Sequence, residues 1–537
     1  MRLKRIQDDF RVFEVLDEKA LLGPGPFTLY RVTKRGLTTL EAVDVLAREA
    51  GVDRSAVAYA GFKDKDGVTG QFMTVEGGRP VQYKDRRLTL RGIGSARRAV
   101  RSDDNLGNSF EIVVRELAAA DMARIRRNLA VVRRQGMPAY FDDQRFGCLR
   151  HGQGYIVRQL LRGDAEGALR SLMCAPSRYG HEKVERFKEG IRRRWGDWDE
   201  LASYCRGRRG ESLFAHLRDE PDDFVGALVR GISTRERTIH LFAWQSHLWN
   251  RAAALWVRSV APEDSIGWLP CDEGPLPVPR ELPPAELRRL QAAKLPLFGQ
   301  GVELGPEAER FYRAVFRAEG VDPEAFLSLD IPGFRPLGEE RDLYMLPQHL
   351  RAAPAERDDV CRKGHKMRLR FTLPRGRYAT LVAKRLALPE SENDPPPRLY
   401  VSRHRLDFPD AEGRMPDEDV KVWRDEERRW QAKRHEQKKE RAGGGRGRPS
   451  PWRDGGKPGR RRAGGPDDRS GWKPGGKPGS GSGRGGKGGR SGRPGGSKPD
   501  WKKKGPGGPR AGGGSSPASG PRPGWGSQWK KQKEDEA

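Results

Sequence analysis

Residues 60–71 (AGFKDKDGVTGQ) form a short charged stretch that concentrates the groups best suited to chemistry. Two carboxylates, Asp64 and Asp66, alternate there with Lys63 and Lys65. An ionised carboxylate can act as a nucleophile or a base, and an ammonium group that points toward it would favour its charged form. A plain surface turn is the alternative interpretation, because Lys-Asp-Gly is ordinary turn chemistry and the glycines let the backbone bend.

Metal binding is the other chemistry that this spacing suggests, because Asp-x-Asp-Gly begins a calcium loop. The further oxygen ligands and the closing glutamate of the twelve-residue loop are missing, which argues against calcium. The five cysteines lie far apart with no C-x-x-C pair, so the sequence indicates neither a zinc cluster nor a disulfide framework. We therefore expect no metal site, and a reducing compartment fits the cysteine pattern.

The charged stretch is expected to connect two strands, residues 56–60 (AVAYA) and residues 71–75 (QFMTV). Other short strands are predicted at residues 10–16, 27–33 and 108–115. A helix is predicted after the capping box of Thr38 and Glu41, with Gly51 as its stop, and a second one over residues 121–135 before Gly136. Strands that alternate with helices predict a sheet with helices packed against it.

The middle of the chain, from His151 to about Ala355, is less regular. Helical stretches such as Thr238–Val257 alternate there with proline-rich connections. His247 on that helix has no carboxylate partner at helical spacing, so we expect a structural role for it. Residues 367–373 then alternate apolar and polar side chains, which predicts a strand that ends at Pro374.

Six motifs, in order along residues 9–390, resemble those of the TruD family of tRNA pseudouridine synthases. They are Asp9-Phe10-x-Val12-x-Glu14, Gly61-x-Lys63-Asp64 followed by Gly67-Val68-Thr69-x-Gln71, Gly107-Asn108-x-Phe110, Tyr140-Phe141-x-x-Gln144-Arg145-Phe146-Gly147, Gln245-Ser246-x-x-Trp249-Asn250 and Leu373-Pro374-x-Gly376-Arg377-Tyr378-Ala379-Thr380. Four positions depart from the family pattern: Ala139 replaces Asn, Asp142 replaces Gly, Trp249 replaces Phe and Arg377 replaces Ser. These departures bear on the local loop geometry more than on the chemistry. An exchange of Gly for Asp is tolerable at a positive φ angle, since Asp adopts that region more easily than most residues.

The resemblance implies a set of site residues. Asp64 would be the catalytic aspartate, with Lys63 beside it as a substrate-binding residue. Phe10, Asn108 and Tyr378 would line the pocket for the target nucleotide. The amide of Asn108 can donate to and accept from a uracil edge. The two rings would stack, with the hydroxyl of Tyr378 spare, whereas Phe110 and Phe146 are expected in the core.

The resemblance also implies the fold and the order of the domains. We expect an α+β fold, in which a pseudouridine-synthase-type catalytic sheet with packed helices is interrupted by an α/β insertion domain. Five parts are predicted in chain order. They are catalytic residues 1–150, insertion residues 151–355, returning catalytic residues 356–416, a charged helix at 417–440 and a disordered tail at 441–537.

The implied activity is a tRNA pseudouridine synthase, with uridine 13 as the usual family target. A uridine in folded RNA must be flipped out before a carboxylate can reach it, and the resemblance implies that no cofactor takes part. One alternative is a non-catalytic RNA-binding protein or RNA chaperone that acts through its basic tail. A glycosidase or nuclease with paired carboxylates lacks a convincing second acid and a metal site.

The charge of the chain supports an RNA partner. The formal net charge is +29, and residues 441–537 contribute +17 from 24 Lys/Arg against 7 Asp/Glu. That segment also contains 31 glycines and five spaced tryptophans, a composition that predicts disorder and suits single-stranded nucleic acid. No long apolar run is present, so the sequence predicts a soluble, cytoplasmic protein that does not bind a membrane. The expected partner is tRNA or another structured RNA. The oligomeric state stays open.

Overall fold

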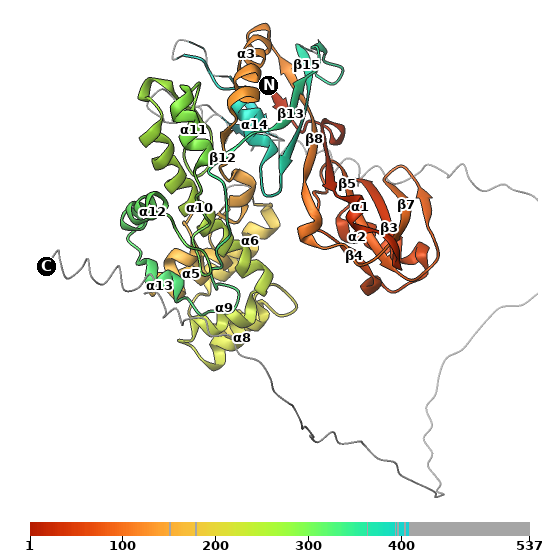
Figure 1. Cartoon of the computed structure of the whole chain (residues 1–537). Helices are drawn as coiled ribbons and strands as arrows, with labels where there is room; N and C mark the ends of the chain where they lie inside the picture. Colours follow the sequence, from red (N-terminus) through yellow and green to blue (C-terminus); the bar gives the residue numbers. More distant parts are fainter. Residues whose placement is uncertain are drawn as a thin grey trace, which may run out of the picture. The chain divides into compact units, whose positions relative to one another are not determined.

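The computed structural model describes residues 1–149, 152–177, 180–361, 363–391, 394, 397–401 and 404–406. The chain divides into two units, Met1–Ala432 and Lys433–Ala537, and the structure below is that of the first. It combines a large sheet with many helices (Figure 1), as expected for an α+β fold. The predicted charged helix at 417–440 and basic tail at 441–537 lie outside the described residues.

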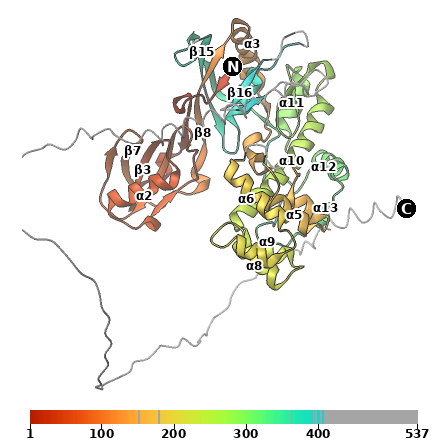
Figure 2. The same ribbon diagram turned by 180° about the vertical axis from the view of Figure 1, so that it is seen from behind.

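A mixed sheet of 13 strands carries the N-terminal part of the chain and its return segment. Its main path runs β17-β16-β1-β8-β2-β5-β3-β7-β6, while β15 pairs with β8, β13 and β14, and β4 pairs with β5. The bounds are β1 Arg2–Leu3, β2 Phe10–Leu16, β3 Leu22–Arg35, β4 Val57–Tyr59, β5 Val68–Glu76, β6 Gln82–Lys84, β7 Leu88–Ala96, β8 Asn105–Leu117, β13 Gln348–Ala352, β14 Glu356–Arg357, β15 His365–Pro374, β16 Leu399–Val401 and β17 His404–Leu406. In the reverse view of Figure 2, β16 lies beside the N-terminus, where it pairs with β1.

Strand β8 is the centre of this sheet because both β2 and β15 pair with it in antiparallel fashion. Residues that pair across strands project to the same face. One face is therefore apolar and buried, with Val12, Phe110 and Phe371 in register. The opposite face carries charged side chains such as Glu111 and Arg370, which form an ion pair of 2.8 Å. The alternation predicted for residues 367–373 is confirmed.

Helix α2 (Thr39–Ala50) covers the half of the sheet that holds β3 and β5. The Thr38 hydroxyl accepts from the Glu41 amide, and the Glu41 carboxylate accepts from the Thr38 amide at 2.6 Å. Gly51 ends the helix at a φ of 73°, a left-handed conformation that glycine adopts without a Cβ penalty. The predicted capping box and stop are both confirmed.

Helices α3 (Ala119–Gln135) and α14 (Ala379–Leu386) lie side by side (Figure 1). The buried amide of Asn128 joins them, because it donates to the backbone carbonyls of Leu386 and Leu388 at 3.0 and 2.8 Å and accepts from Arg385 at 3.0 Å. Gly136 ends α3, and a Cβ there would come within 2.3 Å of the Met345 carbonyl. The helix predicted over residues 121–135 is confirmed and begins two residues earlier.

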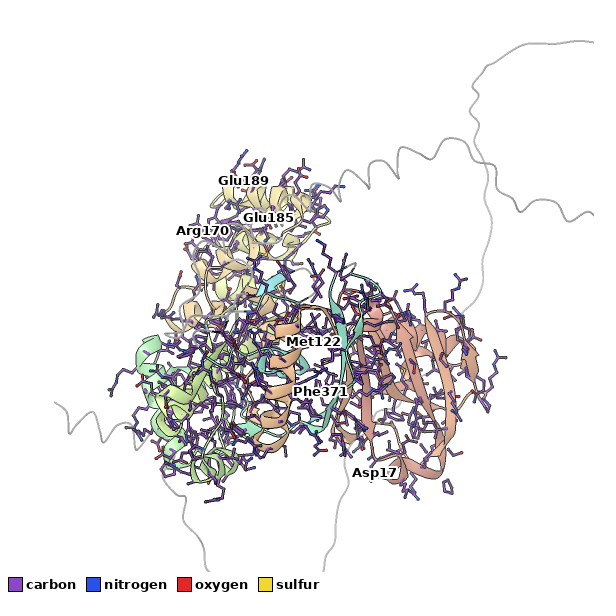
Figure 3. All side chains as sticks on the ribbon, turned by 90° about the horizontal axis from the view of Figure 1, so that it is seen from above. Asp17, Met122, Arg170, Glu185, Glu189 and Phe371 are labelled. Atoms are coloured by element: carbon purple, nitrogen blue, oxygen red, sulfur yellow. The ribbon has the colours of Figure 1, made fainter. Side chains whose placement is uncertain are left out.

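The segment between β9 and β12 is mainly helical, with a short antiparallel pair of strands, β10 and β11. Its bounds are β9 Met137–Pro138, α4 Ile156–Leu161, α5 Ala165–Met173, α6 Glu182–Arg193, α7 Trp198–Tyr204, α8 Glu211–Asp219, α9 Phe224–Gly231, α10 Thr234–Val260, β10 Ile266–Leu269, β11 Leu276–Pro279, α11 Pro284–Ala292, α12 Pro306–Glu319, α13 Pro323–Leu327 and β12 Tyr344–Met345. Helix α10 contributes fully buried Trp244 and Trp249 to its core. Figure 3 shows charged side chains of α5 and α6, with Arg170, Glu185 and Glu189 labelled. The boundaries of the predicted domains stay predictions.

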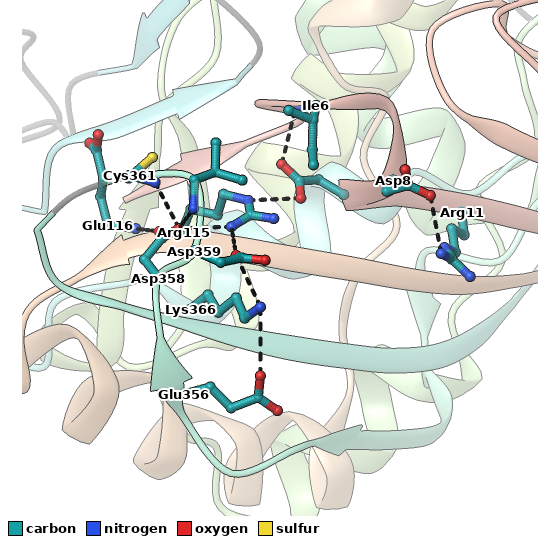
Figure 4. A network of polar contacts seen from close by, with 12 residues as sticks. Ile6, Asp8, Arg11, Arg115, Glu116, Glu356, Asp358, Asp359, Cys361 and Lys366 are labelled. Carbon is teal, nitrogen blue, oxygen red and sulfur yellow. Dashed lines mark hydrogen bonds and ion pairs between the residues drawn. The ribbon is translucent and has the colours of Figure 1, made fainter.

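An ionic network around the buried Arg115 ties the N-terminal segment to the return segment (Figure 4). Arg115 of β8 donates to Asp9 at 2.8 Å and to both Asp358 and Asp359 at 2.7 Å. The second oxygen of Asp9 accepts from the Ile6 amide at 3.0 Å. Asp9, the first residue of the motif at 9–14, therefore holds the chain just before β2 against the sheet.

Candidate active site

Asp64 lies in the loop between β4 and β5, and a buried lysine shapes that loop. The ammonium of Lys34 donates to the backbone carbonyls of Leu37, Lys63 and Asp64 at 2.8, 3.1 and 2.8 Å. The hydroxyl of Thr39 accepts from the Lys63 amide at 3.0 Å. These bonds fix the backbone on both sides of Asp64, so the loop is held from the sheet below and from the first turn of α2.

Lys34 is only 1% exposed. Burial lowers its pKa to about 8, although the nearby charge of Asp64 acts in the opposite direction. Sequence analysis did not single out Lys34. A signal was present, because Tyr30, Val32 and Lys34 alternate along the buried face of β3, where a lysine needs polar partners.

The carboxylate of Asp64 has loose contacts and remains open. Its Oδ2 lies 3.8 Å from the ammonium of Lys4, and its Oδ1 accepts from the Gln144 amide at 3.4 Å. The Asp64 side chain is 41% exposed. Both oxygens can therefore be approached by another molecule. Sequence analysis missed Lys4, which precedes the first motif, and it quoted Gln144 within a motif without giving it a role.

Neither lysine that flanks Asp64 in sequence pairs with its carboxylate. Lys63 forms an ion pair of 2.6 Å with Glu14, in which the two side chains are 11% and 0% exposed. The other oxygen of Glu14 accepts from the Phe72 amide at 2.8 Å. Lys65 approaches Glu41 at 3.8 Å on the surface. The ammonium that approaches the Asp64 carboxylate is that of Lys4, the buried Lys34 ammonium contacts the backbone of the loop, and Lys63 pairs with Glu14 of β2.

Phe10, at the start of β2, lies under the same lysine. The Lys4 ammonium is 3.9 Å from the centre of its ring, a cation–π contact. Phe10 is 6% exposed and packs against Phe110, which stacks on Phe371. Phe110 is thus a core residue, as expected. Lys4 therefore connects Phe10, predicted to line the pocket, with the Asp64 carboxylate.

Asn108 lies in β8 directly opposite Glu14 of β2 and Leu373 of β15. Its side chain shares a face of the sheet with Glu14, and therefore lies beside the Glu14–Lys63 ion pair. Its Oδ1 is buried and has no hydrogen-bond partner among the described residues. A buried amide oxygen without a partner is costly, which marks this atom as a candidate acceptor for a ligand.

Tyr378 occupies the N-cap position of α14. Its hydroxyl accepts from Nε of Arg145 at 3.0 Å, so the interpretation of this hydroxyl as spare was wrong. Its ring meets the edge of Phe141 at 6.0 Å. The guanidinium of Arg145 also lies 5.4 Å from the centre of the Phe141 ring.

The segment that carries Gln144 and Arg145 is anchored by polar contacts on both sides. Asn250 of α10 forms two hydrogen bonds of 2.9 Å with the backbone of Phe141. Lys384 of α14 pairs with Asp142 at 2.5 Å and Asp143 at 2.7 Å. Burial alone would lower the pKa of Lys384, but the two carboxylates outweigh it and raise that pKa. The anchors explain why residues 140–147 reach both Asp64 and Tyr378.

Asp142, the residue that replaces the family glycine, is not among the residues with positive φ. The tolerance of Asp for a positive φ angle is therefore not needed at this position. Asp142 is accommodated because Lys384 and Thr380 both donate to its carboxylate.

His247 lies outside this group, in a separate cavity of about 230 Å³ whose lining includes Arg251, Trp268 and Glu273. Its Nε2 lies 2.8 Å from Glu319 of α12, so a carboxylate partner comes from another helix and not from α10. A different group of possible metal ligands, His216, Glu220 and Asp223, lies in the α8–α9 region. There Asp223 caps α9 and contacts His216 at 2.8 Å, which accounts for both residues.

The described residues contain no helix that is both long and apolar enough to cross a membrane.

Of the predicted site residues, Asp64 and Phe10 both contact Lys4, while Lys63 pairs with Glu14, which lies opposite Asn108 in the sheet. Tyr378 joins Asp64 through the neighbouring residues Arg145 and Gln144.

Comparisons with known proteins give consistent matches along this chain. The model of the family TruD, tRNA pseudouridine synthase D, matches residues 1–267 and 282–386. The chain is 32% identical over 399 residues to the tRNA pseudouridine synthase D of Geobacter metallireducens, covering 71% of this chain and 93% of that protein. The protein of the same name from Aquifex aeolicus is 27% identical over 399 residues, covering 72% and 98%.

A solved structure gives the same fold. The crystal structure of a TruD protein from Methanosarcina mazei superposes with a TM-score of 0.56 at 22% identity, covering 72% of this chain and 92% of that one. At this identity the likeness supports the α+β architecture alone. The family match extends over most of the chain and includes all six motifs. The chain therefore belongs to the TruD family of tRNA pseudouridine synthases, which are isomerases.

Proposed function

We propose that Asp64 is the catalytic carboxylate with which this chain converts a flipped-out uridine of tRNA, at position 13, to pseudouridine. The observation that carries the proposal is the state of the Asp64 side chain. It is 41% exposed, with contacts of 3.8 Å to Lys4 and 3.4 Å to Gln144. Its loop is nevertheless held firmly by Lys34 and Thr39. A rigid backbone with an open carboxylate is what a positioned reactive group requires.

The reaction is an isomerisation with no net gain or loss of atoms. The bond between N1 of uracil and C1′ of ribose breaks, the uracil turns, a bond forms between C5 and C1′, and the C5 proton leaves as N1 gains one. Asp64 serves either as the nucleophile at the sugar or as the base for a sugar proton, and both roles use an ionised carboxylate. Lys4 supplies a fixed positive charge on one side of it.

The remaining residues bind the nucleotide. The buried Oδ1 of Asn108 lacks a partner, and the N3–H of uracil is a suitable donor for it. Phe10, which lies under Lys4, and Tyr378, which is oriented by Arg145, are the two rings that we assign to the pocket. Lys63 has three ammonium protons, and its ion pair with Glu14 leaves donors for the substrate.

The test is single-turnover conversion of unmodified tRNA transcribed in vitro, with Asp64→Asn compared with the matched control Asp66→Asn. Asp66 is exposed, and the described residues show no hydrogen bond or ion pair to its carboxylate. Asp64→Asn should abolish pseudouridine while tRNA affinity stays within a few fold, because the carboxylate acts in the transition state. Asp66→Asn should keep most of the activity.

Three outcomes would contradict the proposal. Wild-type turnover by Asp64→Asn would reject the assignment of the catalytic residue. Loss of activity in Asp66→Asn alone would move the reactive group to Asp66. Tight tRNA binding by the wild-type protein with no pseudouridine at any position would favour the alternative function, that of a non-catalytic RNA-binding protein.

A further inference from the structure

Phe62 is a large apolar side chain in an unusual place, two residues before Asp64 in the same loop. It is 53% exposed. The guanidinium of Arg235, from the first turn of α10, lies 4.7 Å from the centre of its ring, and Tyr59 meets it at 5.4 Å. Two residues of chain span at most about 7 Å, so the backbone of Phe62 lies within that distance of the backbone of Asp64.

Helix α10 continues this surface. Arg235, Ile239 and Phe242 stand four and three residues apart and so lie on one face of the helix. Ile239 and Phe242 are 46% and 38% exposed, although most side chains from His240 to Asn250 are buried. The guanidinium of Arg145 lies 5.8 Å from the Phe242 ring. Phe62, Arg235, Ile239 and Phe242 therefore form one exposed surface. It ends at Arg145, which donates a hydrogen bond to Tyr378.

Rings and guanidinium groups in alternation match one kind of ligand. Bases of a single strand stack on aromatic rings, and arginines bind the phosphates between them. An arginine that covers one face of a ring also fixes the ring while the rest stays open. A purely apolar partner would leave Arg235 and Arg145 without counter-charges. The charge and the position beside Asp64 both favour the RNA strand on either side of the reacting uridine.

We propose that Phe62, Arg235 and Phe242 form a stacking surface for the unpaired nucleotides that flank the target uridine. The proposal rests on the proposed function, because it takes Asp64 as the point where the uridine is held. Phe62 stacks on the base of one immediate neighbour, and Arg235 both fixes that ring and contacts the adjoining phosphate. The surface thereby influences which sequences around the uridine are accepted.

The test combines a protein substitution with an RNA substitution. Phe62→Leu removes the ring and keeps an apolar side chain. Phe13→Leu is the matched control, since Phe13 is 37% exposed on the opposite face of β2 from Phe10. Each variant is titrated with unmodified tRNA and with two tRNAs that carry an abasic nucleotide on the 5′ or the 3′ side of the target. Binding is read by fluorescence anisotropy, and conversion by single turnover.

We expect Phe62→Leu to weaken binding of the intact tRNA by at least about fivefold, the lower limit for one base–aromatic stack. On one of the two abasic tRNAs, Phe62→Leu and wild type should bind alike. Arg235→Gln should weaken binding and reduce the slope of log affinity against log salt by about 0.7, as for one phosphate contact. Phe13→Leu should bind all three RNAs like wild type.

Two results would overturn the stacking surface: equal losses by Phe62→Leu on the intact and both abasic tRNAs, or no loss on any of them. A failure of the proposed function gives a different pattern, because wild-type protein would then bind the tRNA without converting it. The binding data would still decide whether Phe62 stacks on a flanking base.

Discussion

The buried ion pair between Glu14 and Lys63 gives the sharpest prediction, because it joins two of the family motifs beside Asn108. Its charged atoms are 2.6 Å apart, and the side chains are 0% and 11% exposed. Glu14→Gln keeps the shape of the side chain and an oxygen that can accept from the Phe72 amide. The substitution therefore removes the negative charge and leaves the Lys63 ammonium buried without its partner.

Breaking one side of such a pair typically costs about 3–5 kcal/mol. Since Lys63 is 11% exposed, water relieves part of that cost, and we take the lower value of about 3 kcal/mol. The double variant Glu14→Gln/Lys63→Met carries neither charge, so most of the loss should be recovered. The coupling between the two positions, which is the sum of the two single losses minus the loss of the double variant, is then about 5 kcal/mol.

Amide hydrogen exchange of β5 is the suitable assay, because the Phe72 amide donates directly to Glu14 at 2.8 Å. A loss of about 3 kcal/mol in the free energy of local opening speeds exchange by about 150-fold. We expect this rise in both single variants and a rate within about tenfold of wild type in the double variant. Lys65→Met, which removes an exposed ammonium 3.8 Å from Glu41, should exchange within a few fold of wild type.

Wild-type exchange in both single variants would refute the reasoning that this pair supports β5. If the loss of opening free energy in the double variant equalled the sum of the losses in the two single variants, the two residues would act independently.

Three further predictions test the surroundings of Asp64. Burial lowers the pKa of Lys34 to about 8, so above that pH the side chain loses one of the three protons that it donates to backbone carbonyls. Turnover should therefore fall as the pH rises through about 8. Lys34→Met should show low turnover without that fall in a pH–rate profile. Tyr378→Phe removes the bond from Arg145, at a cost of about 1.5 kcal/mol, so single-turnover efficiency should drop about tenfold, and Arg145→Gln should match it if the bond is responsible. Deletion of residues 441–537 removes a net charge of +17, so tRNA affinity should weaken most at low salt and its salt slope should shrink, whereas conversion at saturating protein should persist; an unchanged slope would mean that the tail makes no phosphate contact.

Local signals in the sequence predicted local structure well. Strand β2 runs from Phe10 to Leu16 as expected, and α2 has the predicted cap and stop. These features depend on residues that are three to four positions apart, or on alternation along one strand. The motifs at residues 9–14 and 107–110 lie in β2 and β8, but the strand pairing that puts Asn108 opposite Glu14 was not predicted.

The contacts that complete the candidate site were not predictable in the same way. Gln144 reaches Asp64 across 80 positions, and Arg145 reaches Tyr378 across 233. Lys4 precedes every motif, so nothing local distinguished it from other surface lysines. Such contacts depend on how the helical segment packs beside the sheet, which hydrophobic periodicity does not specify.

The central claim is that Asp64 converts one uridine of tRNA. The most direct measurement maps pseudouridines in the RNA of cells that lack this protein and of the same cells that express either the wild type or Asp64→Asn at equal levels. We predict that a single tRNA pseudouridine, at position 13, disappears with the protein, returns with the wild type and does not return with Asp64→Asn. Its return with Asp64→Asn, or an unchanged map without the protein, would contradict the account.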